Sequence, residues 1–387
     1  MRFTSLKTAI LGMLAMAPLS GTIQKVPDLA PGAALQAAQR QERRYLYVGV
    51  PGADDDIADA GASGILVFDI DNGHELVRRI SSRSADSAPS GSGGERVRGI
   101  AADVNTQRLY VSTGRGITAL DLVTDRVLWE HTYAGGCCDR LDISPDGATI
   151  YAPALGAPKW HVIDAAGGTL LTTIDVQGFP RQTLYSRDGR HVFLAAWQSP
   201  VLSVAAATLH KKIREVGPFG SSVCPFTVNG RGTLAFANVD GLVGFEVADL
   251  QTGMLLDRVI VEGSDMEAWP RYECPSHGIA LTHDERELWV ADGVANRLHV
   301  FDATTYPPVP SRMIPLHAQP RWMIFSVDGR FTYASTGDVI ETASGRIVAV
   351  LDDERGNTVR SEKMIEIDFS GGRPIRAGRQ TATGGRL

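Results

Sequence analysis

The sequence has no second long apolar run, no excess of positive charge and few cysteines. Beyond an apolar run at residues 9–17, no stretch approaches the roughly 20 apolar residues that a membrane-spanning helix needs, so we expect no membrane span in the mature chain. Lysine and arginine number 38 against 44 aspartate and glutamate residues, a net charge of -6. This balance lacks the basic footprint of nucleic-acid-binding proteins and argues against a nucleic-acid partner.

The sequence also lacks the short motifs of several enzyme classes. It contains no GxSxG nucleophile elbow, HExxH zinc motif, P-loop or dinucleotide-binding fingerprint. Its four cysteines do not have the CxxC spacing of metal knuckles. No metal site is therefore predicted from motif spacing alone.

The N-terminus has the pattern of a secretory signal peptide at residues 1–21. Arg2 and Lys7 precede the apolar run at 9–17, and small residues follow it. An uncleaved membrane anchor is the alternative. Residues 22–43 are polar and rich in alanine and glutamine, which indicates a flexible segment. We therefore expect an exported protein, either periplasmic or secreted.

A polar turn followed by an aromatic strand recurs along the chain. The turns begin at residues 103, 144, 186, 229, 282 and 326, so the steps are 41, 42, 43, 53 and 44 residues. Seven positions after each turn begins stands an aromatic residue: Tyr110, Tyr151, Phe193, Phe236, Trp289 and Tyr333. Short β-branched and aromatic runs bounded by turn residues, such as those at 278–281, 287–291 and 297–301, predict strands. Four strands in a unit of about 40 to 45 residues indicate a β-propeller.

The two ends of the repeat region complement each other. Residues 45–80 supply three strands but no first strand, and residues 363–369 form a strand left over at the other end. Pairing the C-terminal strand with the N-terminal blade closes the ring and removes its exposed edges. We therefore predict an all-β, seven-bladed β-propeller over residues 44–370, followed by a C-terminal tail at 371–387.

The repeat motifs resemble those of a known family. SPDGATIYAPA, SVDGRFTYAST and ELWVADGVANRLHVFDATT are similar to motifs of the YVTN-repeat seven-bladed propellers, also described as quinoprotein-amine-dehydrogenase-like or lactonase-like. The resemblance covers most of residues 45–369 and implies the propeller fold. It implies no single function, because that superfamily includes enzymes, electron-transfer subunits and binding scaffolds. A quinoprotein role would require a bound chromophore.

One position of the repeat is predicted to face the central channel. It lies five residues before each turn, on the face where the connections between blades meet and where propellers usually bind ligands. With Lys363 from the first blade, its occupants are Arg98, Asp139, Arg181, Cys224, His277, Arg321 and Lys363. Cations that converge on a narrow channel repel one another unless an anion or a paired acid is present.

The ring predicts a site for a small anionic molecule, such as a sugar acid or an organic acid. Arginine suits two-pronged capture of a carboxylate or a phosphate. The candidate ligand-binding residues are Arg98, Asp139, Arg140, Arg181, Arg321, Trp322 and Lys363. His277 is the candidate catalytic residue, because an ordinary histidine pKa near 6.5 suits proton transfer at neutral pH. As an enzyme, the protein would be a lyase or lactonase acting on an acidic sugar.

Two alternatives remain open for the ring. Asp139, Glu362 and the acidic loop at 54–59 would pair the cations in a structural network, or the propeller would be a non-catalytic scaffold for a protein partner. The same loop offers carboxylates of the kind that Ca²⁺ prefers, without an EF-hand pattern. The candidate disulfide cysteines, whose pairing is not determined, are Cys137, Cys138, Cys224 and Cys274. A soft-metal site built from Cys224, Cys274 and His277 is the alternative to a disulfide.

Overall fold

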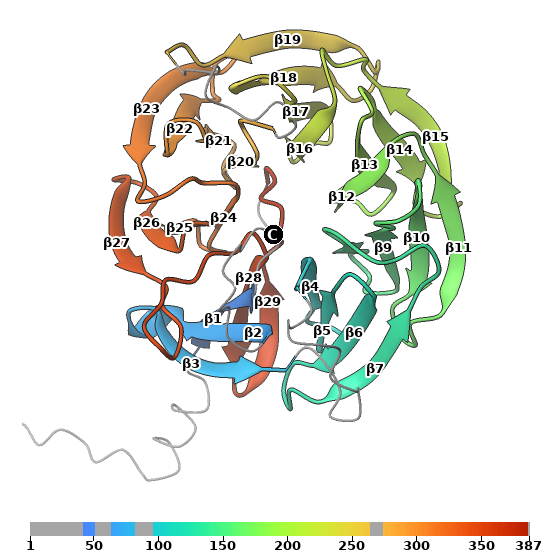
Figure 1. Ribbon diagram of the computed structural model, residues 1–387, viewed down its shortest axis with the longest axis vertical. Helices are drawn as coiled ribbons and strands as arrows, with labels where there is room; N and C mark the ends of the chain where they lie inside the picture. Colours follow the sequence, from blue (N-terminus) through green and yellow to red (C-terminus); the bar gives the residue numbers. More distant parts are fainter. Residues whose placement is uncertain (1–41, 51–62, 82–95, 264–273, 386–387) are drawn as a thin grey trace, which may run out of the picture. The chain divides into compact units, whose positions relative to one another are not determined.

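The computed structural model describes residues 42–50, 63–81, 96–263 and 274–385. These residues form a ring of seven antiparallel sheets, which confirms the predicted seven-bladed β-propeller (Figure 1). The predicted signal peptide and the acidic loop at 54–59 lie outside the described residues. In the described part of the chain, none of the helical structure has the length and apolarity that a membrane crossing requires.

Six of the blades are four-stranded sheets in which the chain runs from the innermost strand to the outermost. Blade 2 contains β4 (Gly99–Asp103), β5 (Arg108–Ser112), β6 (Gly116–Asp121) and β7 (Val127–Thr132). Blade 3 contains β8 (Asp142–Ile143), β9 (Thr149–Pro153), β10 (Lys159–Asp164) and β11 (Leu170–Asp175). Blade 4 contains β12 (Phe179–Tyr185), β13 (His191–Trp197), β14 (Leu202–Ala206) and β15 (Lys211–Val216).

The remaining four-stranded blades follow the same order. Blade 5 contains β16 (Val223–Val228), β17 (Leu234–Val239), β18 (Gly244–Asp249) and β19 (Leu255–Ile260). Blade 6 contains β20 (Ile279–Leu281), β21 (Glu287–Asp292), β22 (Arg297–Asp302) and β23 (Val309–Pro315). Blade 7 contains β24 (Met323–Phe325), β25 (Phe331–Ala334), β26 (Asp338–Glu341) and β27 (Arg346–Val350).

Blade 1 joins the two ends of the described chain in a five-stranded sheet of order β29-β28-β1-β2-β3. Its elements are β1 (Glu42–Val50), β2 (Gly64–Asp69), the 3-10 helix η1 (Ile70–Asn72), β3 (Glu75–Ile80), β28 (Met364–Ser370) and β29 (Arg373–Ala377). The pairing of β28 with β1 runs from Glu42 opposite Ser370 to Val48 opposite Met364, which is the predicted ring closure. Strand β29 adds a further strand on the inner side, so the sheet continues past residue 370 into the segment predicted as a tail.

The Ser-Pro-Asp-Gly turn before β9 explains why its residue types recur. Ser144 accepts hydrogen bonds at Oγ from the backbone amides of Ala148 and Thr149, at 3.1 and 2.9 Å. Gly147 has φ 71°, and a Cβ there would lie 2.4 Å from a carboxylate oxygen of Asp103. A residue with a side chain would be strained at this positive φ and would clash with Asp103, so glycine is required at this position.

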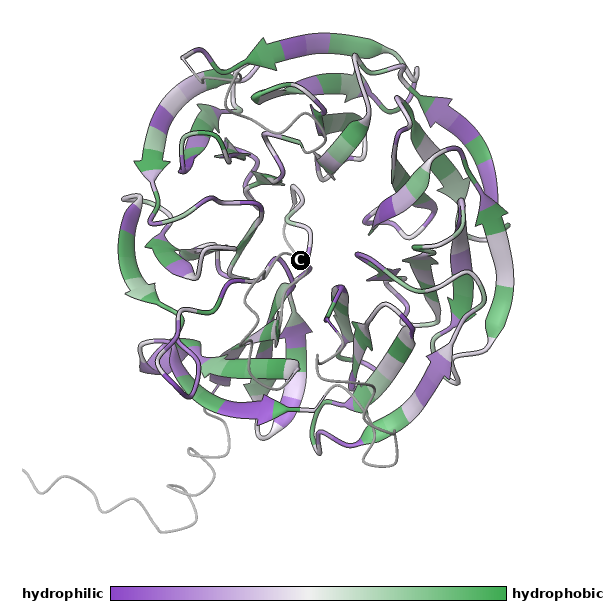
Figure 2. Ribbon diagram, in the orientation of Figure 1, coloured by the Kyte–Doolittle hydropathy of each residue, from purple (hydrophilic) through white to green (hydrophobic). Residues whose placement is uncertain are grey.

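The core is divided among the seven junctions between neighbouring blades. One cluster joins Tyr110 of β5 with Ile150 of β9, and another joins Leu46 of β1 with Tyr333 of β25. The repeated aromatic residue of the second strand is buried in all six copies of the turn motif. The outermost strands instead alternate between hydrophilic and hydrophobic positions, as one half-buried face requires (Figure 2).

The last described segment, residues 378–385, lies inside the ring (Figure 1). Three of its residues hold it to three different blades. Trp322 donates its indole N–H to the Gln380 carbonyl at 2.7 Å, Gln182 donates to Thr381 Oγ1 at 3.2 Å, and the Thr227 hydroxyl donates to the Ala382 carbonyl at 2.6 Å. The C-terminal segment therefore fills part of the central channel and ties blades 4, 5 and 7 together.

Candidate functional site

A pocket of about 280 Å³ opens where the innermost strands of the blades begin. It brings together six of the seven residues predicted from the repeat position: Arg98, Asp139, Arg181, Cys224, His277 and Arg321. These six residues are far apart in the chain and belong to six different blades, blades 2 to 7. Arg140, predicted as a neighbour of Asp139, also lines the pocket. The repeat register therefore identified a real convergence of side chains.

Local backbone geometry sets the direction of Arg181. The register of β12 with β13 shifts between Pro180 and Gln182, so Arg181 occupies a β-bulge. A bulge re-aims the side chain of the extra residue. Arg140 is held beside this strand, because its carbonyl accepts a hydrogen bond from the Thr183 amide at 3.1 Å.

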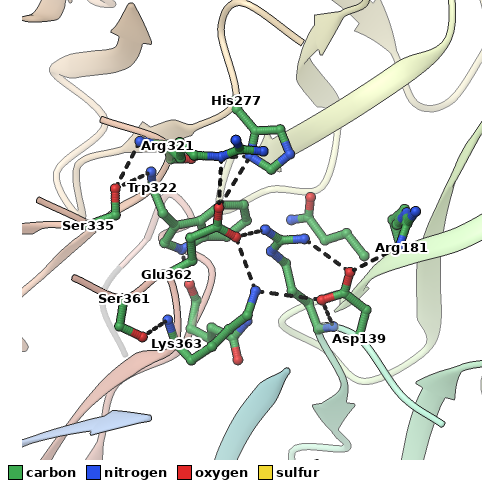
Figure 3. Close-up of polar contacts among 12 residues, drawn as sticks. Asp139, Arg181, His277, Arg321, Trp322, Ser335, Ser361, Glu362 and Lys363 are labelled. Atoms are coloured by element: carbon green, nitrogen blue, oxygen red, sulfur yellow. Dashed lines mark hydrogen bonds and ion pairs between the residues drawn. The ribbon is translucent and has the colours of Figure 1, made fainter. Parts of the chain in front are cut away.

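Glu362 stands at the centre of the polar network below the pocket (Figure 3). Its Oε1 lies 3.3 Å from Arg321 Nε and 3.7 Å from His277 Nδ1. Its Oε2 lies 3.1 Å from Lys363 Nζ and also pairs with the Arg140 guanidinium. A single buried carboxylate thus faces two arginines, one lysine and one histidine.

Asp139 is the second carboxylate of the network. Its oxygens lie 3.5 Å from Lys363 Nζ, 3.4 Å from Arg140 Nη1 and 3.8 Å from Arg181 Nη1. Burial alone would raise the pKa of Asp139, but the positive charges of Arg140, Lys363 and Arg181 outweigh it and lower the pKa. Asp139 is therefore ionised at neutral pH.

Among the described residues, the site has more basic than acidic side chains. The basic side chains are Arg98, Arg140, Arg181, Arg321 and Lys363, and the acidic ones are Asp139 and Glu362. The Arg181 side chain is 42% exposed, and its only ion pair within the described residues is the 3.8 Å contact with Asp139. For the Arg98 side chain, the described residues provide no ion pair at all. Within the described residues, Arg98 and Arg181 are thus the cations of the pocket whose charge is least compensated.

His277 is neutral at physiological pH. Burial lowers the pKa of His277 to about 3, and the nearby positive charges of Arg140, Arg321 and Lys363 act in the same direction against the opposing charge of Glu362. Nδ1 lies 3.4 Å from the Arg321 carbonyl, which can only accept a hydrogen bond, so Nδ1 carries the proton. The other ring nitrogen, Nε2, is then a hydrogen-bond acceptor and a weak base.

Two residues predicted to bind the ligand lie behind the pocket wall. The Lys363 side chain is completely buried between the two carboxylates, and burial lowers the Lys363 pKa. Trp322 is 2% exposed, and the Arg140 guanidinium covers one face of its ring at 4.4 Å. Lys363 and Trp322 thus support the residues that face the pocket, and neither lines it.

The repeat register did not identify Trp197 as part of the site, although Trp197 lines the pocket. Trp197 is the last residue of β13, where the chain enters the connection between the second and third strands. In a propeller these connections open on the same face as the mouth, so the end of each second strand is the signal that points to such a residue. The sequence predicts Glu362 only as a counter-ion for the cations, and the signal for its place in the site is its position next to Lys363.

The structure pairs all four cysteines. Cys224 and Cys274 form a disulfide with a Cα–Cα distance of 6.3 Å, and both residues line the pocket. Cys137 and Cys138 form the second disulfide, which is buried directly before Asp139. Because the sulfurs of Cys224 and Cys274 are bonded to each other, they do not form the soft-metal site considered with His277. The described residues contain no group of three or more His, Cys, Asp or Glu side chains arranged to hold a metal ion.

Comparison with known proteins adds no closer assignment. No protein-family model matches the chain, and no curated protein was found to be similar to it. The fold defines the class of the protein as a seven-bladed β-propeller. The link to YVTN-repeat propellers rests on the repeat motifs alone.

Proposed function

We propose that this propeller binds a small organic anion through its carboxylate group in the pocket at the channel mouth. The observation that carries the proposal is the weak pairing of two pocket cations within the described residues: Arg98 has no ion pair there, and the 42% exposed Arg181 has only a 3.8 Å contact with Asp139. A bound anion relieves the repulsion between partly buried cations, and a guanidinium matches the two oxygens of a carboxylate.

The proposed ligand is small. The pocket volume of about 280 Å³ lies just below the roughly 300–1,000 Å³ that sites for drug-sized ligands occupy. The C-terminal segment occupies part of the channel next to the site, where Trp322 and Gln182 both donate hydrogen bonds to it. A partly occupied channel of this kind favours a compact ligand over a polymer threaded through the ring.

We favour binding over catalysis as the role of the site. A lyase or lactonase needs a base that accepts a proton near neutral pH, and the low pKa of His277 makes this residue a poor one. Neutral His277 instead offers Nε2 as a hydrogen-bond acceptor. Catalysis is the second candidate function, because His277 and Arg321 stand side by side over Glu362 (Figure 3).

Titration calorimetry of the full chain tests the proposal with a panel of acetate, benzoate, glucuronate and phosphate. We expect at least one carboxylate to bind, and we expect the double variant Arg98→Gln, Arg181→Gln to weaken its binding about tenfold or more. Arg190→Gln is the matched control. Arg190 lies in the turn before β13, at the end of the strand away from the pocket, and its side chain is 81% exposed. Equal effects in the double variant and in this control, or no carboxylate bound, contradict the proposal.

A single further variant separates binding from catalysis. His277→Ala retains the cations of the pocket, so a binding protein keeps most of its affinity for the carboxylate. If the wild-type protein turns over an unsaturated or lactone substrate and His277→Ala binds it without turnover, catalysis replaces binding as the function.

We also propose that the chain is exported. The proposal rests on the signal-peptide pattern at residues 1–21, and two disulfides fit an oxidising compartment. Mass spectrometry of the N-terminus of the protein from fractionated cells tests it. A mature N-terminus beginning near residue 22 supports export, and an intact Met1 in the cytoplasmic fraction opposes it.

A further inference from the structure

The pocket lining combines two chemical characters, which we call its cationic side and its apolar side. The cationic side consists of Arg98, Arg181 and Arg321, with the neutral His277 beside them. The other side is formed by Trp197, Val223, Pro225 and the Cys224–Cys274 disulfide, none of which carries a hydroxyl or carboxyl group. A ligand that fills both sides needs an anionic end and an apolar body.

The lining has little capacity to accept hydrogen bonds from a ligand. The Asp139 carboxylate faces Arg140, Arg181 and Lys363, as described above, and cations likewise surround Glu362. The Gln182 amide is also engaged, because its oxygen accepts from the Phe226 amide at 3.0 Å.

The nitrogen of the same Gln182 amide donates to the Phe226 carbonyl at 2.9 Å and to Thr381 at 3.2 Å. Of the described residues that line the pocket, none is a serine, threonine or asparagine. Besides His277 Nε2, the described lining side chains thus offer few acceptors for the several hydroxyl hydrogens of a sugar, and each hydroxyl left without an acceptor loses a hydrogen bond to water, which disfavours a sugar acid.

Trp197 supplies a flat apolar surface next to a cation. The Arg181 guanidinium lies 5.9 Å from the centre of the Trp197 ring, and the ring of Phe179, on the same strand β12, also lies 5.9 Å from the Trp197 ring. Phe179 is paired with Trp197 across β12 and β13, so the pair holds the indole in place. A ring stacked on Trp197 would carry a carboxylate directly toward Arg181.

We infer that the ligand of this pocket is an aromatic carboxylic acid rather than an acidic sugar. The inference rests on the proposed binding of an organic anion and specifies its chemical class. The carboxylate pairs with Arg181 and Arg98, the aromatic ring packs on Trp197 and the disulfide, and His277 Nε2 accepts a hydrogen bond from any polar substituent. This assignment replaces the uronate-like ligand expected from the cationic ring alone.

Titration calorimetry of the full chain with three probes tests the inference: benzoate, glucuronate and the uncharged benzamide. We expect benzoate to bind at least ten times more tightly than either of the other two. Trp197→Ala should weaken benzoate binding about tenfold and change acetate binding less than twofold, because acetate has no ring to stack. Trp129→Ala, at a partly buried indole on blade 2 away from the pocket, is the matched control for loss of a tryptophan.

The outcomes separate this inference from the proposed function. Glucuronate binding as tight as benzoate overturns the inference and leaves anion binding in place. Benzamide binding as tight as benzoate overturns both, because the charge then contributes nothing. Binding of no carboxylate also overturns both. An equal loss of benzoate affinity in Trp197→Ala and Trp129→Ala, with both variants folded by circular dichroism, removes the stacking role of Trp197.

Discussion

The guanidinium of Arg140 lies 4.4 Å from the centre of the Trp322 ring and also pairs with the carboxylate of Glu362. Arg140 and Trp322 come from blades 3 and 7, which are not neighbours in the ring. The contact spans the channel mouth, and Trp322 continues it by donating a hydrogen bond to the Gln380 carbonyl. A cation, a ring and the C-terminal segment thus form one connected layer below the pocket.

Removing Arg140 should destabilise the fold. Arg140→Ala removes a buried ion pair and a cation–π contact, and we expect a loss of about 3 kcal/mol in the free energy of unfolding. Urea denaturation followed by tryptophan fluorescence measures it. Arg190→Ala, at an exposed surface position, should change the same quantity by less than about 0.5 kcal/mol. A similar small change for both variants would show that the network contributes little.

The affinity of the pocket for a carboxylate should be nearly constant between pH 5.5 and 8. The pKa of His277 is about 3, so the histidine stays neutral throughout this range, and Asp139 stays ionised because its pKa is lowered. Calorimetric titration with benzoate at four pH values measures the affinity. A rise of tenfold or more as the pH falls through 6.5 would mean that His277 gains a proton there and that its burial is less complete.

The stability of the protein should fall as the pH rises from about 5 toward 9. Burial and the neighbouring Asp368 raise the pKa of Glu366 to about 9, so the folded state holds a proton that the unfolded state has released above its ordinary pKa of 4.5. Each pH unit in which only the folded state holds that proton lowers the free energy of unfolding by about 1.4 kcal/mol.

Glu366→Gln removes this proton uptake. At pH 8.5 the variant should be more stable than the wild type by about 2 kcal/mol or more, and the difference should shrink toward pH 5. Urea midpoints at pH 5, 7 and 8.5 measure it, with Glu75→Gln on the exposed edge of β3 as the control. If the stability of the wild type and of Glu366→Gln changed with pH in parallel, Glu366 would not hold a proton in the folded state.

Deleting residues 378–387 should loosen both the ring and the pocket. The deletion removes seven hydrogen bonds between this segment and the ring. Three come from the side chains of Trp322, Gln182 and Thr227, and the other four involve Gly378, Arg379, the Gln380 side chain and Gly384. At about 1 kcal/mol for each bond, we expect a loss of about 7 kcal/mol and weaker benzoate binding. Thermal unfolding and calorimetry measure the two effects. Unchanged values for both would show that the segment is a passive occupant of the channel.

The two disulfides should differ greatly in their effect on stability. Cys224 and Cys274 are separated by 50 residues, and closing a loop of that length stabilises the fold by about 4 kcal/mol. Cys137 and Cys138 are adjacent and close almost no loop. The double variants Cys224→Ser, Cys274→Ser and Cys137→Ser, Cys138→Ser can be compared by urea denaturation. Equal losses would contradict the loop-closure argument.

Local sequence was sufficient to predict the blades. A turn such as the one at Ser144 needs Gly147 at a positive φ and places Tyr151 at a fixed distance along the next strand. These requirements act over a few residues, so they recur visibly in the chain. Because each repeat has the same register, the residues five before each turn, including Arg181 and His277, were predicted to meet at the mouth, and they line one pocket.

Tertiary structure decided what those residues do to one another. Lys363 and Trp322 occupy the predicted ring positions or their neighbours, yet both are buried behind the pocket wall. Whether a side chain at a given register faces solvent or a buried partner depends on the counter-charge that another blade supplies, which here is Glu362 or Asp139. Periodicity along the chain carries no information about such pairings.

The sequence alone determined a ring of seven blades with a cationic mouth, because strand periodicity, turn chemistry and the position of each first strand are local properties. Only the folded ring decided that Trp197 joins the site, that residues 378–385 fill the channel, and that His277 is a neutral acceptor rather than a base. Each of these features depends on distances between residues of different blades. Burial and Coulomb interactions across such distances exist only once the ring has closed.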